Sequence, residues 1–96
     1  MERVSYSQKS KQDLLDIWLY IAADSPNSAD KLLADIENRL FILAKNPRIG
    51  HQRNDVSGDA LCFPHKKYLI LYRQQDGGIE VVRVVHGMRD IKNISF

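Results

Sequence analysis

The chain from residue 68 to residue 86 reads YLILYR, then QQDGG, then IEVVRVVH. Two apolar runs rich in branched and aromatic residues, joined by an Asp-Gly-Gly turn, are the pattern of a β-hairpin. The predicted strands are Tyr68–Arg73 and Ile79–His86, with a turn at Gln74–Gly78. Valines fall on both faces of the second run, which predicts a central strand of the sheet.

The polar residues at the end of this central strand are the first candidates for function. Arg83 and His86 interrupt the apolar run, and Arg89 and Asp90 follow just after Gly87. We therefore expect the functional site near the end of this strand.

The first half of the chain predicts a short strand and two helices. Arg3–Tyr6 has strand character, and Ser7 has the side chain of a helix N-cap. A helix over residues 8–24 follows, with its apolar stripe formed by Leu14, Ile17, Trp18 and Ile21. Asp13 and Asp16 are expected on its solvent side.

A second helix begins at Ser25-Pro26, because proline suits a first helical turn but cannot continue the preceding helix. Its apolar stripe is formed by Ala29, Leu32, Leu33, Ile36, Leu40 and Leu43, and it ends at Asn46-Pro47. The short connection predicts an antiparallel helix hairpin.

The remaining segments complete the predicted fold. Residues 48–59 are expected to be an exposed loop. This loop contains the basic residues Arg48, His51 and Arg53, which we interpret as solvated side chains rather than as a binding site. Ala60–Phe63 is a third short strand, closed by Pro64-His65, and a tail with Ile91, Ile94 and Phe96 is expected to pack back onto the core.

Strand, helix, helix, strand, strand, strand is the order of an α+β domain. The expectation is one domain over residues 1–96, with the helix hairpin packed on one face of a mostly antiparallel sheet. The position of the first strand in that sheet is open, because short strands fix the hairpin but not their other neighbours.

Composition restricts the class of function. The net charge of +2 is too small for bulk electrostatic binding of DNA or RNA, so no direct sequence-specific nucleic-acid binding is expected. The single Cys62 is expected to be a small buried hydrophobic residue in a reducing compartment. Without an apolar stretch of about 18 residues or a secretory signal, we expect a cytoplasmic protein that does not cross a membrane.

Metal and cofactor sites are not expected. Cys62 and the three histidines do not follow zinc-ligand spacing, and the chain has no glycine-rich phosphate loop.

Several short patterns together resemble a known family. They are Leu14-x-x-Ile17-Trp18-x-x-Ile21, Leu43-Ala44-x-x-Pro47-x-x-Gly50, Phe63-Pro64, Tyr68-x-x-x-Tyr72-Arg73, and Val82-x-x-Val85-His86-Gly87-x-Arg89-Asp90. In this order and spacing, from Ser7 to Asp90, they resemble the ParE branch of the RelE/ParE superfamily, the toxins of bacterial type II toxin–antitoxin pairs.

The resemblance implies a compact RelE-like α+β fold and two protein partners. One is a cognate antitoxin, whose C-terminal segment folds across the helix hairpin and sheet. The other is DNA gyrase, which toxins of this branch poison by contact and without catalysis of their own. Target contacts are then expected at Arg73, Arg83, His86, Arg89 and Asp90.

Antitoxin contacts are expected mainly on the helices. Leu15, Leu19, Phe41 and Ile42 fall off the apolar stripes, and a monomer rarely leaves a large contiguous apolar patch bare. They are expected to line a groove for an amphipathic segment, together with Trp18 and Tyr72. Trp18 also has a simpler interpretation as a core residue beneath the hairpin.

Two alternatives remain. The RelE branch cuts messenger RNA on the ribosome, which requires a base, an acid and a cation to hold phosphate. His86, Arg83, Arg89 and Lys67 would carry that reaction here, with Lys66 and Tyr72 nearby, but Leu69 stands where those ribonucleases typically have arginine. The other alternative is a relative that binds its antitoxin without being toxic.

Overall fold

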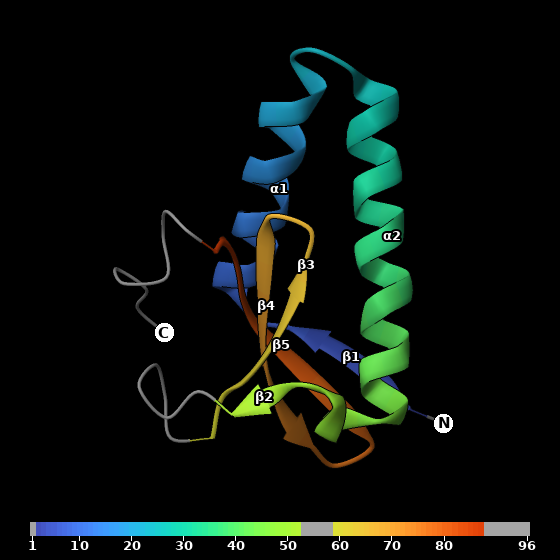
Figure 1. The fold of residues 1–96 in the computed structure, drawn as a ribbon, viewed down its shortest axis with the longest axis vertical. Helices are drawn as coiled ribbons and strands as arrows, with labels where there is room; N and C mark the ends of the chain where they lie inside the picture. Colours follow the sequence, from blue (N-terminus) through green and yellow to red (C-terminus); the bar gives the residue numbers. More distant parts are fainter. Residues whose placement is uncertain (1, 53–58, 88–96) are drawn as a thin grey trace.

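The computed structural model describes residues 2–52 and 59–87, and its elements follow the predicted order with two additions, a 3-10 helix and a short strand after the second helix. The strands and helices are β1 (Arg3–Tyr6), α1 (Gln8–Ala22), α2 (Pro26–Lys45), the 3-10 helix η1 (Pro47–Ile49), β2 (His51–Gln52), β3 (Leu61–His65), β4 (Tyr68–Gln75) and β5 (Gly78–His86). Figure 1 shows α1 and α2 side by side, joined at one end, as expected for a helix hairpin.

The five strands form one sheet in the order β1-β5-β4-β3-β2. β5 lies between β1 and β4, which confirms the central strand predicted from its valines on both faces. β1 runs parallel to β5, with Arg3 opposite Gly78 and Tyr6 opposite Val81, and the other pairs are antiparallel. This settles the position of the first strand.

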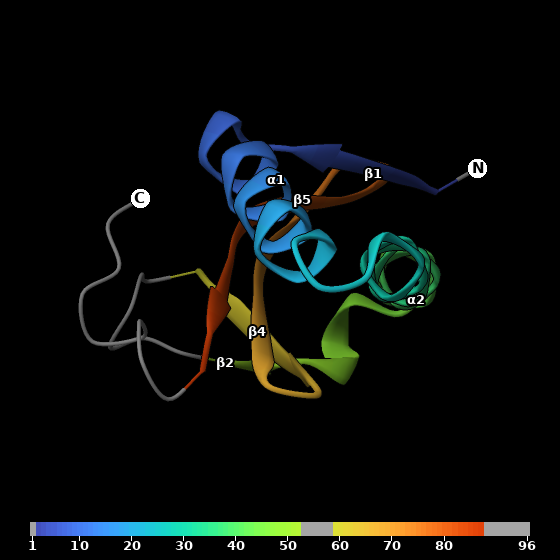
Figure 2. The ribbon, with the colours of Figure 1, turned by 90° about the horizontal axis from the view of Figure 1, so that it is seen from above.

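The sheet curves around the helices rather than lying flat beneath them. In the view along the helices, it bends from β1 beside α1 to β2 on the other side (Figure 2). The main core lies between these layers and joins α2 to β4 and β5; its buried members are Leu32, Ile36, Leu40, Leu43, Ala44, Ile70, Tyr72, Ile79, Val81 and Val84. The α+β fold with a helix hairpin on a mostly antiparallel sheet is confirmed.

Both helices begin where the sequence predicts. The Ser7 hydroxyl accepts a hydrogen bond from the Ser10 amide at 3.0 Å, and the Ser25 hydroxyl accepts one from the Ser28 amide at 3.2 Å. Such caps satisfy amide groups that have no partner within a helix. Neither helix has the length and apolar character needed to cross a bilayer; this finding covers the described residues.

A second, smaller apolar cluster lies on the sheet face away from the helices. Cys62, Leu71 and Val85 are at most 4% exposed there, and Leu69 packs against them. Cys62 is therefore buried, as predicted, and Leu69 belongs to this outer face.

The structure differs from the sequence prediction in four places. The polar stretch predicted as a loop contains β2, in which His51 and Gln52 pair with Cys62 and Leu61. β3 continues through Pro64 to His65, and the hairpin turn is Asp76-Gly77 rather than five residues. The predicted helix over residues 8–24 ends at Ala22.

Tyr72 anchors the segment after α2 to the core. Its side chain is fully buried, its hydroxyl donates to the Pro47 carbonyl at 2.6 Å, and it accepts from the Gly50 amide at 2.9 Å. Burial raises the pKa of this phenol, while the Gly50 hydrogen bond acts in the opposite direction. The expectation that Tyr72 offers a surface to an antitoxin is wrong for this structure, because none of its side chain is accessible.

Candidate binding pocket

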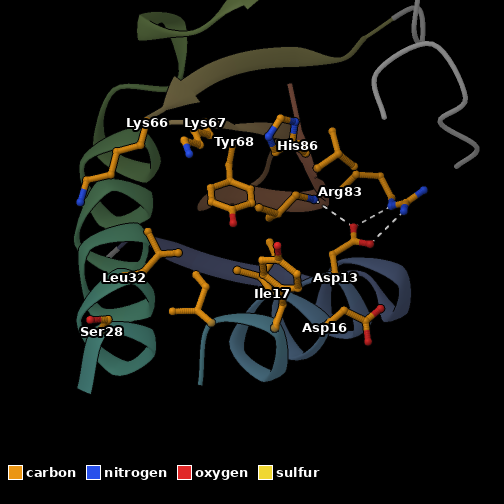
Figure 3. Close-up of a pocket in the computed structure, with 14 residues that line it drawn as sticks. Asp13, Asp16, Ile17, Ser28, Leu32, Lys66, Lys67, Tyr68, Arg83 and His86 are labelled. Carbon is orange, nitrogen blue, oxygen red and sulfur yellow. Dashed lines mark hydrogen bonds and ion pairs between the residues drawn. The ribbon is translucent and has the colours of Figure 1, made fainter. Parts of the chain in front are cut away.

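An open pocket of about 810 Å³ lies between α1, the start of α2, the β3–β4 turn and the end of β5. Its lining is Asp13, Asp16, Ile17, Tyr20, Ile21, Ser28, Leu32, Lys66, Lys67, Tyr68, Arg83, Val84, Val85 and His86. Figure 3 shows the lysines at one end and the two carboxylates at the other. The volume is within the usual range for ligand pockets, about 300–1,000 Å³.

The basic end of the pocket is a two-residue turn. Lys66 and Lys67 join β3 to β4, and Lys66 adopts a left-handed conformation with a φ of 55°. The Lys66 ammonium lies 3.8 Å from the Asp35 carboxylate of α2. One lysine is therefore drawn toward α2 by an exposed ion pair, which contributes little stability.

Tyr68 and His86 sit opposite each other where β4 begins and β5 ends. Their rings meet edge to face, with centroids 6.0 Å apart and an interplanar angle of 79°. Such a contact is favourable for aromatic rings and fixes the orientation of the imidazole. His86 is thus held by its strand neighbour beside the lysine turn.

The neighbouring His65, at the end of β3, has a lowered pKa. Burial lowers its pKa, and the positive charges of Lys66 and Arg39 lower it further, while Asp35 acts in the opposite direction. These effects favour the neutral form of the His65 imidazole.

Asp13 connects α1 to the edge of β5 at the other end of the pocket. Its carboxylate accepts from Arg83 Nε at 2.7 Å, from Arg83 Nη2 at 2.9 Å and from the Val84 amide at 3.0 Å. The two side chains are 14% and 18% exposed. This bidentate pair with an added amide is a strong form of carboxylate binding.

Ser7 completes the same edge. Its amide donates to the Val81 carbonyl at 2.9 Å and its hydroxyl donates to the Val82 carbonyl at 2.7 Å. β1 ends at Tyr6, so Ser7 and Asp13 bond the backbone of β5 where the neighbouring strand stops. The start of α1 thereby takes the place of a longer strand.

The expectation that Asp13 lies on the solvent side of its helix is wrong. Asp13 follows buried Ser10 by three residues and precedes Ile17 by four, so it stands at the border of the buried helical face. That border position is the signal in the sequence, but its partner is 70 residues away. The structure was needed to identify the pair.

Most of the residues named for the ribonuclease alternative line the pocket, but they are not arranged for that reaction. Arg83, His86, Lys66 and Lys67 all line it. The guanidinium of Arg83, however, points toward Asp13 and away from the lysines (Figure 3). Tyr72 is buried in the core, and Arg89 lies outside the described residues.

The predicted target contacts do not form one cluster. Arg73 lies on β4 and pairs with Glu80 at 3.4 Å and with Asp59 at 3.9 Å, and it does not line the pocket. Arg83 and His86 share the pocket, whereas Arg89 and Asp90 lie outside the described residues, as do Arg53 and the tail with Ile91, Ile94 and Phe96.

The predicted antitoxin contacts on the helices are exposed. Leu15 and Leu19 are 50% and 54% exposed, and Phe41 and Ile42 are 49% and 42% exposed. None of the four lines the pocket. Trp18 is half-buried and its indole donates to the Asp30 carboxylate at 2.8 Å, so it links the two helices rather than filling the core.

Comparison with known proteins agrees with this architecture. The model of a family described as the ParE toxin of the type II toxin–antitoxin system parDE matches residues 4–91. A solved structure of the chromosomal ParDE toxin–antitoxin system from P. aeruginosa has a TM-score of 0.73 at 19% identity, covering 90% of this chain and 96% of that chain. That likeness establishes a shared fold, and a comparison with curated proteins gave no match. Because the family match spans nearly all of the residues, the chain belongs to the ParE toxin family of type II toxin–antitoxin systems.

Proposed function

We propose that this toxin poisons DNA gyrase by protein–protein contact and is neutralised by a cognate antitoxin. The observation that carries the choice against catalysis is the Asp13–Arg83 pair. Arg83 is the pocket's best candidate for holding a phosphate, and two of its N–H groups are bonded to a carboxylate of the same chain. A ribonuclease needs such a cation available to stabilise developing phosphate charge.

The direct test uses purified gyrase and supercoiled plasmid. The toxin is expected to inhibit supercoiling and to increase the amount of protein-linked cleaved DNA, and preincubation with the antitoxin is expected to abolish both effects. Gyrase that remains fully active at a molar excess of toxin, in a preparation that arrests growth when expressed, would contradict the proposed target.

The ribonuclease alternative keeps one specific observation in its favour, since Lys66, Lys67 and His86 line the same pocket. Primer extension on messenger RNA from cells expressing the toxin distinguishes it. Ribosome-dependent cleavage that disappears in His86→Ala would establish catalysis, whereas uncut messenger during growth arrest excludes it. Absence of growth arrest would instead identify an antitoxin-binding relative without toxicity.

We assign the antitoxin contact to the exposed apolar residues of the hairpin. Leu15 and Leu19 are one helical turn apart on α1, so they present a continuous apolar strip to an amphipathic segment. Replacing both with serine is expected to weaken antitoxin binding by about 10–100-fold, because each leucine is about half-exposed in the free toxin and therefore gains about half of the roughly 1.5–3 kcal/mol of full burial.

The matched control for this double variant is Tyr20→Ser. Tyr20 is 77% exposed and lies on the same helix, but its side chain faces the pocket. Isothermal titration with the antitoxin, combined with thermal unfolding of each toxin variant, separates lost contact from lost stability. Unchanged affinity of the leucine double variant for the antitoxin would show that these helix residues are not part of the interface.

A further inference from the structure

The Asp13 carboxylate occupies a site with the groups of an anion-binding site. Two guanidinium N–H groups of Arg83 and the Val84 amide converge on it at 2.7–3.0 Å. An arginine fork with an added backbone amide is the donor set that proteins use to bind a phosphate or a carboxylate from another molecule. Here the anion belongs to the same chain.

Without the Asp13 carboxylate, the groups around this site would favour an anion from another molecule. The pocket beside this site is also lined by Lys66, Lys67 and His86, and by Tyr68, an aromatic residue of the kind on which bases stack. Within residues 2–52 and 59–87, the carboxylates that line it are Asp13 and Asp16. Of these, Asp13 is the one bonded to Arg83, and Asp16 lies on the exposed side of α1.

We propose that Asp13 is a specificity-determining residue that occupies a latent phosphate site and thereby reserves the pocket for protein partners rather than single-stranded RNA. Two effects produce this exclusion. The carboxylate fills the space in which a phosphate would meet the Arg83 fork, and its charge repels a phosphodiester. Removing the carboxylate takes the Asp13 acceptor away from two N–H groups of Arg83 and from the Val84 amide, a donor set that favours an anion.

This inference deepens the proposed function, since it names the residue that separates a protein-binding toxin from an RNA-binding one. It rests on the proposed function only for its biological meaning. The experiment below uses neither gyrase nor antitoxin, so its outcome is independent of whether gyrase is the target.

The first measurement is the thermal unfolding of Asp13→Ala in phosphate and in chloride at equal ionic strength. An anion that binds the folded state raises its stability by mass action. Inorganic phosphate is therefore expected to raise the Tm of this variant by several degrees more than that of the wild type. The additional substitution Arg83→Gln is expected to abolish the difference, and the matched control Asp16→Ala is expected to behave like the wild type.

The second measurement is the binding of a fluorescein-labelled single-stranded RNA of about ten nucleotides, followed by anisotropy. Asp13→Ala is expected to bind at least about tenfold more tightly than the wild type, and Asp16→Ala within about twofold. The slope of log K against log salt should steepen by about 0.7, the value for one added phosphate contact on a single strand. A purely structural role for Asp13 would not produce an Arg83-dependent change in this slope.

Asp13→Asn provides the same test if the alanine variant does not fold. The asparagine side chain removes the negative charge but still occupies the site and accepts from the Val84 amide, so this variant is expected to bind RNA more tightly than the wild type by a smaller factor than alanine, with the same dependence on Arg83. RNA affinity within twofold of the wild type in the folded variants, or phosphate stabilisation that persists in Arg83→Gln, would overturn the proposal.

Discussion

Asp13→Ala is expected to lower the free energy of unfolding by about 3 kcal/mol. Removing one partner of a buried ion pair costs about 3–5 kcal/mol, because the other charge is left poorly solvated. The Asp13 and Arg83 side chains are 14% and 18% exposed, which places the expected cost at the low end. The Val84 amide also loses its acceptor.

A loss of this size is readily measured. For a domain of about 100 residues, each kcal/mol corresponds to about 4–8 °C in Tm, so the expected decrease is about 12–24 °C. Asp13→Asn should lose less, because its amide oxygen still accepts one of the three hydrogen bonds. Asp16→Ala, an exposed neighbour on the same helix, should change stability by no more than about 0.5 kcal/mol. Equal losses in Asp13→Ala and Asp16→Ala would refute the role assigned to the pair.

Gly78→Ala is expected to cost about 2–3 kcal/mol, because a methyl group at this position has no room. Gly78 is opposite Arg3 in the parallel pair of β1 and β5. An added Cβ would meet the backbone nitrogen, carbon and oxygen of Arg3, all closer than the 3.0 Å limit of real Cβ contacts. A backbone cannot rotate away as a side chain can, so β1 must shift from β5.

The neighbouring glycine provides the control for this prediction. Gly77 has a φ of +79° but nothing within 4 Å of an added Cβ, so Gly77→Ala should cost about 1 kcal/mol through backbone strain alone. Urea unfolding gives both values, and amide exchange should show faster opening of β1 in Gly78→Ala. If the two variants were equally stable, the close approach of β1 would not be the reason for glycine at position 78.

The boundaries that differ from the sequence prediction have physical reasons. The sequence prediction closed the third strand at Pro64-His65, and proline cannot donate a ladder hydrogen bond. In the structure, β2 pairs with Leu61 and Cys62 of β3. Pro64 lies farther along β3, where no β2 residue of the described ranges is opposite it, so the strand continues without an amide donor at this position. β2 itself has two polar, exposed residues and therefore gives no periodic signal.

The candidate site was predictable only in part. The end of β5 was identified from Arg83 and His86 inside an apolar run, and both line the pocket. Asp13 was missed, and Tyr72 was assigned to a surface although it is buried. A tyrosine in an apolar strand fits a core position or an interface equally well, and its partners Pro47 and Gly50 are more than 20 residues away.

The sequence by itself determined the helix hairpin, the terminal β-hairpin, the central position of β5 and the family. These features depend on residues close together in the chain: apolar periodicity, helix caps, a short turn and ordered motifs. Only the tertiary structure decided which charges the pocket presents. Asp13 and Arg83 meet because β1 ends at Tyr6 and leaves the edge of β5 to the first turns of α1. A contact across 70 residues depends on how the whole sheet is ordered, and no local pattern specifies that order.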